Sequence, residues 1–153
     1  MIVRQLLLKS PAATRALGKK LGAVLQPGDF VALIGELGAG KTLLVKAVAE
    51  GAGAEPATSP SFALVNRYRG PVLLQHLDLY RVASAGELFS LGFDDLVAEP
   101  AATLCEWADR AQAALPADRL EIVLEHAGPR SRKVRLHATG PRAEKLLAAI
   151  VSL

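Results

Sequence analysis

The sequence has one cysteine, little excess charge and no long apolar run, and each of these absences excludes a class of protein. Because Cys105 is the only cysteine, no internal disulfide can form, and a reducing compartment is the simpler expectation. No run of about 18 apolar residues occurs, which excludes a membrane-spanning helix. The 18 Lys and Arg against 15 Asp and Glu give a net charge of +3, which permits an anionic partner without requiring one. We therefore expect a cytoplasmic protein.

The length of the chain limits the number of domains. With 153 residues, 51% of them hydrophobic, the chain can bury one core and is too short to divide comfortably into two. We therefore predict a single domain over residues 1–153. The first nine residues are interrupted by Arg4 and Gln5 and lack a small-residue cleavage site, so they do not have the pattern of a signal peptide.

Helix-forming and strand-forming segments alternate along the chain. After a short apolar stretch at 2–8, Ser10 and Pro11 have the residue types of a helix N-cap and a first helical position. Apolar side chains then recur on one helical face until Pro27-Gly28. A continuous apolar run at 30–34 has the length of a strand. It is followed by a glycine-rich loop and by a helical pattern at 41–50.

The rest of the chain alternates in the same way. The segments 62–69 and 72–79 flank Gly70-Pro71 and are expected to pair as a hairpin. The segment 52–61 is rich in Gly, Pro and Ser and is expected to be a loop. The remaining expected elements are helices near 86–91, 108–114 and 143–151, and strands at 102–106, 119–125 and 133–138.

The loop between the strand at 30–34 and the helix at 41–50 carries the pattern Gly-x-x-x-x-Gly-Lys-Thr. Glycines allow consecutive backbone N–H groups to turn inward around an anion, and the following helix adds the positive end of its dipole. Lys41 supplies a charge for the β- and γ-phosphates of ATP, and the Thr42 hydroxyl can ligate Mg²⁺. We therefore predict that ATP is bound by Gly35, Glu36, Leu37, Gly38, Ala39, Gly40, Lys41 and Thr42.

The order of strand, phosphate loop and helix also predicts the fold class. We expect an α/β fold of the P-loop NTPase type with three layers. A mixed central sheet would combine parallel strands with antiparallel hairpins, and helices would cover both of its faces.

Two acidic residues end apolar strands and could complete the nucleotide site. Asp78 ends the run at 72–78, and Glu106 ends the run at 102–106. A carboxylate at such a position can hold Mg²⁺ or orient the attacking water, although either residue could equally be an ordinary acidic strand end. The loop Thr58–Ser61 could sense the γ-phosphate, as switch segments do, or could be a plain polar turn.

Several short blocks, taken in order and spacing, resemble the TsaE (YjeE) family over residues 10–110. These blocks are the phosphate loop, Ser59-Pro60-Ser61-Phe62, His76-Leu77-Asp78-Leu79-Tyr80-Arg81 and Glu106-Trp107. The resemblance implies a bacterial ATPase that, with the TsaB and TsaD proteins, supports attachment of threonylcarbamoyl to adenosine 37 of tRNAs reading ANN codons.

The resemblance also implies roles for single residues. Thr42 and Glu106 would hold Mg²⁺, and Asp78 would lie near the γ-phosphate. With Lys41, the two acidic residues would form the catalytic set. Binding of the nucleotide would extend to the switch-like loop with Ser59 and Ser61, and to Thr14 near the base.

Other residues permit more than one interpretation. Trp107 could stack on a nucleotide or a partner, or could pack against the core. The three histidines, His76, His126 and His137, have no metal-ligand spacing and are assigned no catalytic role, and Cys105 is expected to be a buried small hydrophobe. A basic cluster could contact tRNA phosphates, although a solvated hairpin is the preferred interpretation. The cluster consists of Arg130, Arg132, Lys133 and Arg135.

Two other functions share the phosphate loop. A small P-loop kinase would need a group that binds its acceptor and an Arg-bearing lid, and no clear lid segment is evident. A nucleotide-gated binding module with negligible turnover would use Asp78 and Glu106 only for the fold and the Mg²⁺ site. ADP release measured with and without the partner proteins separates these functions from a partner-dependent ATPase.

Overall fold

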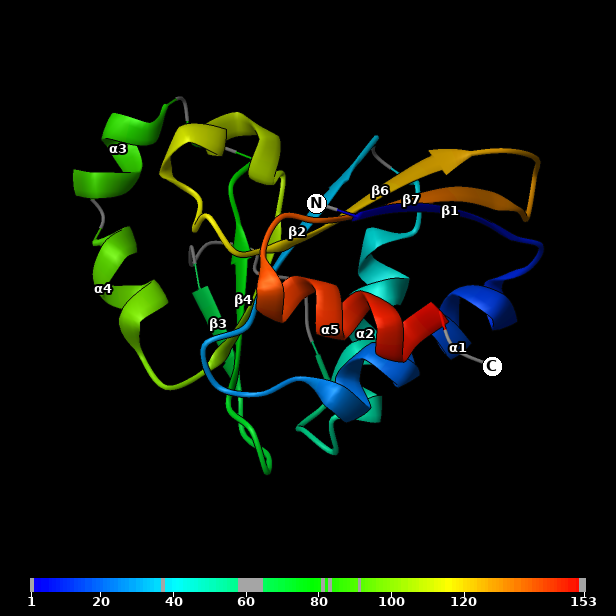
Figure 1. Cartoon of the computed structure of the whole chain (residues 1–153), viewed down its shortest axis with the longest axis horizontal. Helices are drawn as coiled ribbons and strands as arrows, with labels where there is room; N and C mark the ends of the chain where they lie inside the picture. The colour runs from blue at the N-terminus through cyan, green and yellow to red at the C-terminus, as the bar shows by residue number, and fades with distance from the viewer. Residues whose placement is uncertain are drawn as a thin grey trace.

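A mixed β-sheet forms the centre of the molecule (Figure 1). The computed structural model describes residues 2–36, 38–57, 65–80, 82, 84–90 and 92–151. Within these residues the sheet has seven strands in the order β1-β7-β6-β2-β5-β4-β3. The strands are β1 (Ile2–Leu8), β2 (Phe30–Gly35), β3 (Val65–Tyr68), β4 (Leu74–Asp78), β5 (Ala102–Glu106), β6 (Leu120–His126) and β7 (Arg132–Ala138).

Parallel pairs occupy the middle of the sheet and antiparallel pairs its two sides. Strand β2 is parallel to both β5 and β6, and β4 is parallel to β5. The pairs β1·β7, β6·β7 and β3·β4 are antiparallel. This arrangement confirms the predicted mixed sheet. Because parallel strands run in one direction, the carboxyl ends of β2, β4 and β5 meet at one edge.

Helices cover both faces of the sheet, as the sequence predicted (Figure 1). One face is covered by α1 (Pro11–Val24), α2 (Lys41–Gly51) and α5 (Pro141–Val151). The other face is covered by α3 (Ala85–Ser90), α4 (Phe93–Ala98) and the 3-10 helix η1 (Ala108–Ala114).

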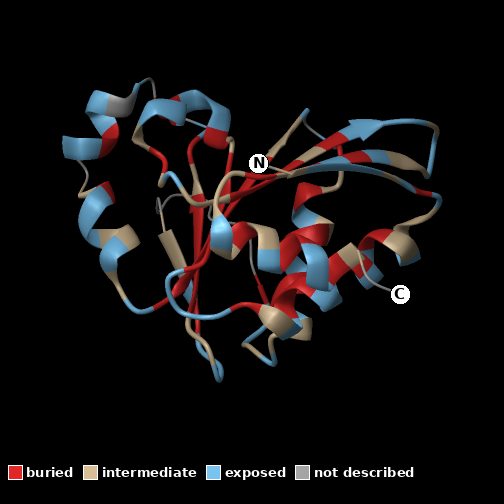
Figure 2. Ribbon diagram, in the orientation of Figure 1, coloured by how far each residue is buried: buried red, intermediate tan, exposed pale blue. Residues whose placement is uncertain are grey.

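The side chains of β2 alternate between two buried cores. Val31 and Leu33 belong to the core beneath α1, α2 and α5, whereas Phe30 and Ala32 belong to the core beneath α3, α4 and η1. Figure 2 shows the buried residues concentrated along the central strands and on the helix sides that face them. A strand buried on both faces explains why the apolar run at 30–34 is continuous and does not alternate.

Helix α1 begins and packs for reasons that are visible in its sequence. The Ser10 side chain accepts a hydrogen bond from the Ala13 N–H at 3.2 Å, and Pro11 occupies the first turn, as predicted. A Cβ added at Gly22 would lie 2.1 Å from the Val48 carbonyl oxygen, so the glycine permits close approach of α1 and α2. The helix ends at Val24, three residues before the predicted Pro27.

The structure also differs from the sequence prediction elsewhere. The apolar stretch at 2–8 is an edge strand, and α4 was not predicted. The helix predicted at 108–114 is of the 3-10 type, with non-helical backbone angles at Ala111. The two C-terminal strands begin or end one residue away from their predicted bounds. In the predicted hairpin at 62–79, residues 62–64 lie outside the described part of the chain.

Among the helices that the structure describes, none has the length and apolar character needed to cross a membrane.

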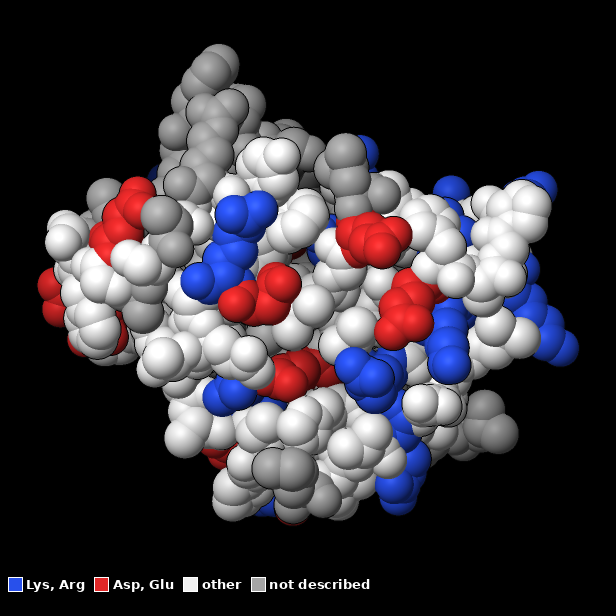
Figure 3. All heavy atoms as spheres, turned by 90° about the horizontal axis from the view of Figure 1, so that it is seen from above, with Lys and Arg blue, Asp and Glu red and all other residues white. Residues whose placement is uncertain are grey.

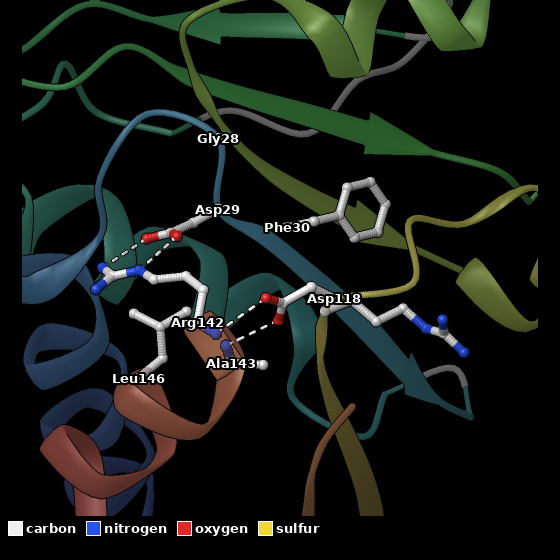
Figure 4. Close-up of a pocket in the computed structure, with 8 residues that line it drawn as sticks. Gly28, Asp29, Phe30, Asp118, Arg142, Ala143 and Leu146 are labelled. Atoms are coloured by element: carbon white, nitrogen blue, oxygen red, sulfur yellow. Dashed lines mark hydrogen bonds and ion pairs between the residues drawn. The ribbon is translucent and has the colours of Figure 1, made fainter. Parts of the chain in front are cut away.

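A partly buried ion pair fastens α5 to the start of β2 (Figure 4). The Arg142 guanidinium donates to both carboxylate oxygens of Asp29 at 2.8 and 2.9 Å, and the Asp29 side chain is only 2% exposed. These hydrogen bonds raise the pKa of Arg142. Asp118 accepts the backbone N–H groups of Arg142 and Ala143, each at 2.9 Å, and so caps α5. These groups line a small cavity of about 60 Å³.

We predict that Arg142→Ala destabilises the protein by about 3 kcal/mol, because it leaves the Asp29 carboxylate buried without its cationic partner. Urea unfolding followed by circular dichroism measures this change. Lys145→Ala, an exposed change on the same helix, is the control and should stay within about 0.5 kcal/mol of the unmodified protein. A loss no larger for Arg142→Ala than for the control would show that the ion pair does not hold α5.

Candidate functional site

Polar and charged side chains converge at the edge where β2, β4 and β5 end. In the sheet register, Glu106 of β5 lies between Leu33 of β2 and Asp78 of β4. Strand β2 leads through the glycine-rich loop to Lys41, the first residue of α2. The charges of Glu106 and Asp78 both act on the Lys41 amine. The fold therefore brings together the three residues that the sequence proposed as catalytic.

The glycine-rich loop has a backbone conformation that requires glycine. Gly38 and Gly40 have φ angles of 80° and 105°, in the left-handed region that side chains disfavour. Gly40 is the N-cap of α2 and has no side chain with which to cap the helix. The first N–H groups of α2 and its positive dipole end therefore suit an external anion. Leu37, in the middle of the predicted loop, lies outside the described residues.

Lys41 is buried, with 5% of the residue exposed. Its Nζ donates a hydrogen bond to the Gly35 carbonyl at 2.5 Å and lies 3.5 Å from the centroid of the Trp107 ring, a cation–π contact. Burial lowers the pKa of Lys41, whereas the negative charges of Glu106, Asp109 and Asp78 oppose that shift. The amine is thus a desolvated cation held among carboxylates.

Trp107 packs against the charged site as well as against the core. Its ring centroid is 5.0 Å from that of Tyr80, and the Arg110 guanidinium lies over both rings. Trp107 has φ 57° and ψ 34°, which is an unfavourable left-handed conformation for a bulky residue. Such strain is concentrated at functional sites in proteins. The indole therefore contacts Lys41 directly, and both interpretations made from the sequence remain compatible with its position.

Glu106 is held by a histidine to which the sequence assigned no role. Glu106 as a whole residue is 8% exposed, and its Oε2 lies 2.5 Å from Nε2 of His76. The Nδ1 atom of His76 is 2.9 Å from the Tyr68 hydroxyl. Asp78, at the end of the next strand, accepts the Tyr80 backbone N–H through Oδ1 at 2.9 Å. Both carboxylates are therefore oriented by hydrogen bonds.

Arg132 is not solvated as expected for the basic cluster, because its side chain contacts the glycine-rich loop. Its Nε donates to the Ala39 carbonyl at 3.1 Å, and a terminal nitrogen reaches the Gly38 carbonyl at 3.4 Å. Arg130, Lys133 and Arg135 are exposed, as that interpretation expected. Arg132 thus ties the start of β7 to the glycine-rich loop. This contact could not be predicted from local patterns, because it depends on β6 lying beside β2.

The remaining predicted residues have varied positions. Thr42 is exposed in the first turn of α2, whereas Thr14 is buried on α1. The predicted loop residues Ser59 and Ser61 lie outside the described residues, as does Arg81.

Cys105 is fully buried, and burial raises the pKa of its thiol, which confirms the expectation of a small hydrophobe. Within the described residues no group of three or more His, Cys, Asp or Glu side chains has the arrangement of a metal site.

A hollow of about 490 Å³ lies beside the start of the loop. Its lining includes Gly35, Trp107 and three acidic side chains, those of Glu36, Asp109 and Glu125. Figure 3 looks onto this end of the molecule and shows several acidic side chains close together over the middle of the face. Carboxylates therefore line the hollow beside Lys41, and Arg110 and Arg132 lie close to the same residues.

Comparison with known proteins gives consistent matches over most of the chain. The family model "Threonylcarbamoyl adenosine biosynthesis protein TsaE" matches residues 8–134. The tRNA threonylcarbamoyladenosine biosynthesis protein TsaE of Bacillus subtilis is 39% identical over 139 residues, which are 90% of this chain and 87% of that protein. The protein of the same name in Treponema pallidum is 35% identical over 127 residues, 82% of this chain and 94% of that protein.

A solved structure matches as well. The crystal structure of Bacillus subtilis YdiB superimposes with a TM-score of 0.82 at 35% sequence identity, covering 98% of this chain and 96% of that one. The similarity in three dimensions therefore extends beyond residues 10–110 into the C-terminal third of the chain.

We predict that Lys41→Met does not destabilise the protein in the absence of ligand. Burial lowers the pKa of Lys41 because it disfavours the charged form, so the charge costs stability wherever the amine is protonated in both the folded and the unfolded protein. The apolar replacement should raise the thermal midpoint by a few degrees, on the order of 1 kcal/mol. The fluorescence of Trp107, the only tryptophan, should change at the same time.

The matched control is Lys46→Met, an exposed change on the same helix that should affect neither measurement. A thermal midpoint for Lys41→Met well below that of this control would mean that the lysine stabilises the fold, contrary to its desolvated position.

Proposed function

The chain belongs to the TsaE family of threonylcarbamoyl adenosine biosynthesis proteins, and on this basis we propose that it acts in the threonylcarbamoylation of tRNA. Its role would be that of a cytosolic, Mg²⁺-dependent ATPase subunit. It would act on a partner complex of TsaB and TsaD that modifies adenosine 37 of tRNAs reading ANN codons. The observation that carries the proposal is the buried Lys41, which donates to the Gly35 carbonyl of the glycine-rich loop and on which the charge of Glu106 acts.

The glycine-rich loop supports ATP binding. Its left-handed glycines and the uncapped start of α2 suit a phosphate group, and Lys41 would turn from the Gly35 carbonyl to the β- and γ-phosphates. Anionic phosphates would favour the charged form of this lysine and so offset the effect of burial on its pKa. Nucleotide binding would thus offset the cost of burying the Lys41 charge in the free protein.

Glu106 and Thr42 have the chemistry of Mg²⁺ ligands. Mg²⁺ takes oxygen ligands, and in nucleotide sites one or two protein groups hold it together with phosphates and waters. The lack of a three-residue metal cluster among the described residues is therefore compatible with such a site. Only Oε2 of Glu106 is hydrogen-bonded within the described part of the chain, which leaves Oε1 for a cation. Bound Mg²⁺ would neutralise charge on the transferred phosphoryl group.

Asp78 would lie near the γ-phosphate, where a carboxylate can orient the attacking water. Its position beside Glu106 in the register and its electrostatic effect on Lys41 support this role. Attack of water on the γ-phosphorus would break the bond to the β-phosphate oxygen and release ADP and phosphate. No residue that we identify performs threonylcarbamoyl transfer, so we assign that step to the partner complex.

The proposal predicts that ADP release is slow for the protein alone and rises when purified TsaB, TsaD and tRNA are added. Lys41→Ala and Glu106→Ala should each lower the stimulated rate by at least about tenfold, because each removes a charged contact worth roughly 1.5–3 kcal/mol. Lys46→Ala serves as the control. A rate that partners leave unchanged, or full activity in both site variants, would refute the proposal, and a requirement for a small acceptor would indicate a kinase.

We predict that Arg132→Gln weakens ADP binding about tenfold without lowering the thermal midpoint. The guanidinium holds the Gly38 and Ala39 carbonyls, so its loss should leave the loop N–H groups less well ordered for phosphate. Isothermal titration with ADP measures the affinity. Lys133→Gln, an exposed neighbour on β7, is the matched control. Equal affinities for the two variants would mean that the contacts of Arg132 do not prepare the loop.

A further inference from the structure

A chain of buried, hydrogen-bonded side chains leads from the edge strand β3 to Glu106. The Tyr68 hydroxyl lies 2.9 Å from Nδ1 of His76, and Nε2 of His76 lies 2.5 Å from Oε2 of Glu106. The three residues are 4%, 2% and 8% exposed. Water therefore competes little for these hydrogen bonds, and their geometry is set by the protein.

The chemistry of the groups determines the direction of the hydrogen bonds. An ionised carboxylate only accepts, so Nε2 of His76 carries the hydrogen that Glu106 accepts. In a neutral imidazole Nδ1 is then an acceptor, and the Tyr68 hydroxyl donates to it. Tyr68 thus holds the His76 ring through Nδ1 in the tautomer that Glu106 requires, and His76 restricts the rotation of the Glu106 carboxylate.

The register of three neighbouring strands places these side chains on one face. Tyr68 pairs with Leu74 across β3 and β4, and His76 pairs with Leu104 across β4 and β5. Leu74 and Leu104 belong to the same core as Tyr68, which is the core beneath α2. The chain of hydrogen bonds therefore lies on the side of the sheet that carries the helix after the glycine-rich loop. Its alignment follows from the backbone pairing of the whole β3·β4·β5 unit.

We propose that His76 and Tyr68 are positioning residues that aim Oε1 of Glu106, which has no hydrogen bond within the described residues, at the divalent cation of the nucleotide site. This inference rests on the proposed function, because it takes Glu106 to be a ligand of Mg²⁺. Hydrogen-bond partners of metal ligands usually change metal affinity by about 10–100-fold when they are removed. The affinity of the site for Mg²⁺ therefore depends on edge strand β3, which supplies none of the proposed ligands.

A purely structural role for His76 predicts different behaviour. If the histidine only filled a polar position in the core, its loss would lower the unfolding free energy and would affect binding with and without metal alike. A positioning role concerns the orientation of one carboxylate. It therefore affects binding only when the metal is present.

The test is the binding of ADP in EDTA and in a series of Mg²⁺ concentrations, measured by isothermal titration together with thermal unfolding. His76→Leu should weaken Mg²⁺ binding to the ADP complex by about 10–100-fold, while the ADP affinity in EDTA stays within about twofold of the unmodified protein. Tyr68→Phe, which removes one oxygen atom, should give a smaller loss of the same kind. His76→Gln should recover part of the loss, because its amide can donate to Glu106.

A second histidine–carboxylate pair supplies the matched control. His137 of β7 contacts Glu121 through Nδ1 at 3.0 Å, at the opposite end of the strands from the glycine-rich loop. His137→Leu should leave the Mg²⁺ dependence unchanged. If His76→Leu does not fold, the comparison of Tyr68→Phe with the unmodified protein decides the question.

Two results would overturn the inference. One is a His76→Leu protein, or a Tyr68→Phe protein, with unaltered Mg²⁺ dependence. The other is an equal loss of ADP affinity in EDTA and in Mg²⁺. Failure of the proposed function is distinguishable, because Glu106→Gln would then leave the Mg²⁺ dependence intact. If Glu106→Gln weakens the Mg²⁺ dependence of ADP binding and His76→Leu does not, the positioning role is rejected and the proposed function is retained.

Discussion

Parallel pairing through β2, β5 and β4 is the constraint on which the site depends. It places Leu33, Glu106 and Asp78 in one row across three strands, and the glycine-rich loop begins two residues after Leu33. A shift of one residue in either ladder would turn the carboxylates to the opposite face of the sheet. The buried apolar strands that hold this register therefore also set the distance between Lys41 and its acidic neighbours.

Several features at this edge of the sheet cost stability and fit the ligand site that we propose. Lys41 is a desolvated cation, and the backbone of Trp107 is left-handed. A protein optimised for stability alone would replace such groups, and their concentration at one place is typical of functional sites. By contrast, the polar groups around Asp29 and Arg142 at the other end of β2 satisfy one another and hold α5 in place. The two ends of the same strand thus serve different purposes.

Local patterns predicted the elements well, whereas contacts between distant segments could not be predicted. The bounds of β5 agree with the prediction residue for residue, because its apolar run is ended by Glu106. The link from Arg132 to the glycine-rich loop spans more than 90 residues and exists only because β6 pairs with β2. The link from His76 to Glu106 likewise requires the order of the strands. A single sequence contains no signal for either contact.

The central claim is that this edge of the sheet holds ATP with a metal ion. A crystal structure with a non-hydrolysable ATP analogue and Mn²⁺, located by its anomalous scattering, tests it most directly. We expect phosphates within the loop at 35–42, Lys41 turned toward the β- and γ-phosphates, and Mn²⁺ bound by Thr42 and Glu106. A nucleotide bound elsewhere, or a metal ion without contact to Glu106, would contradict it.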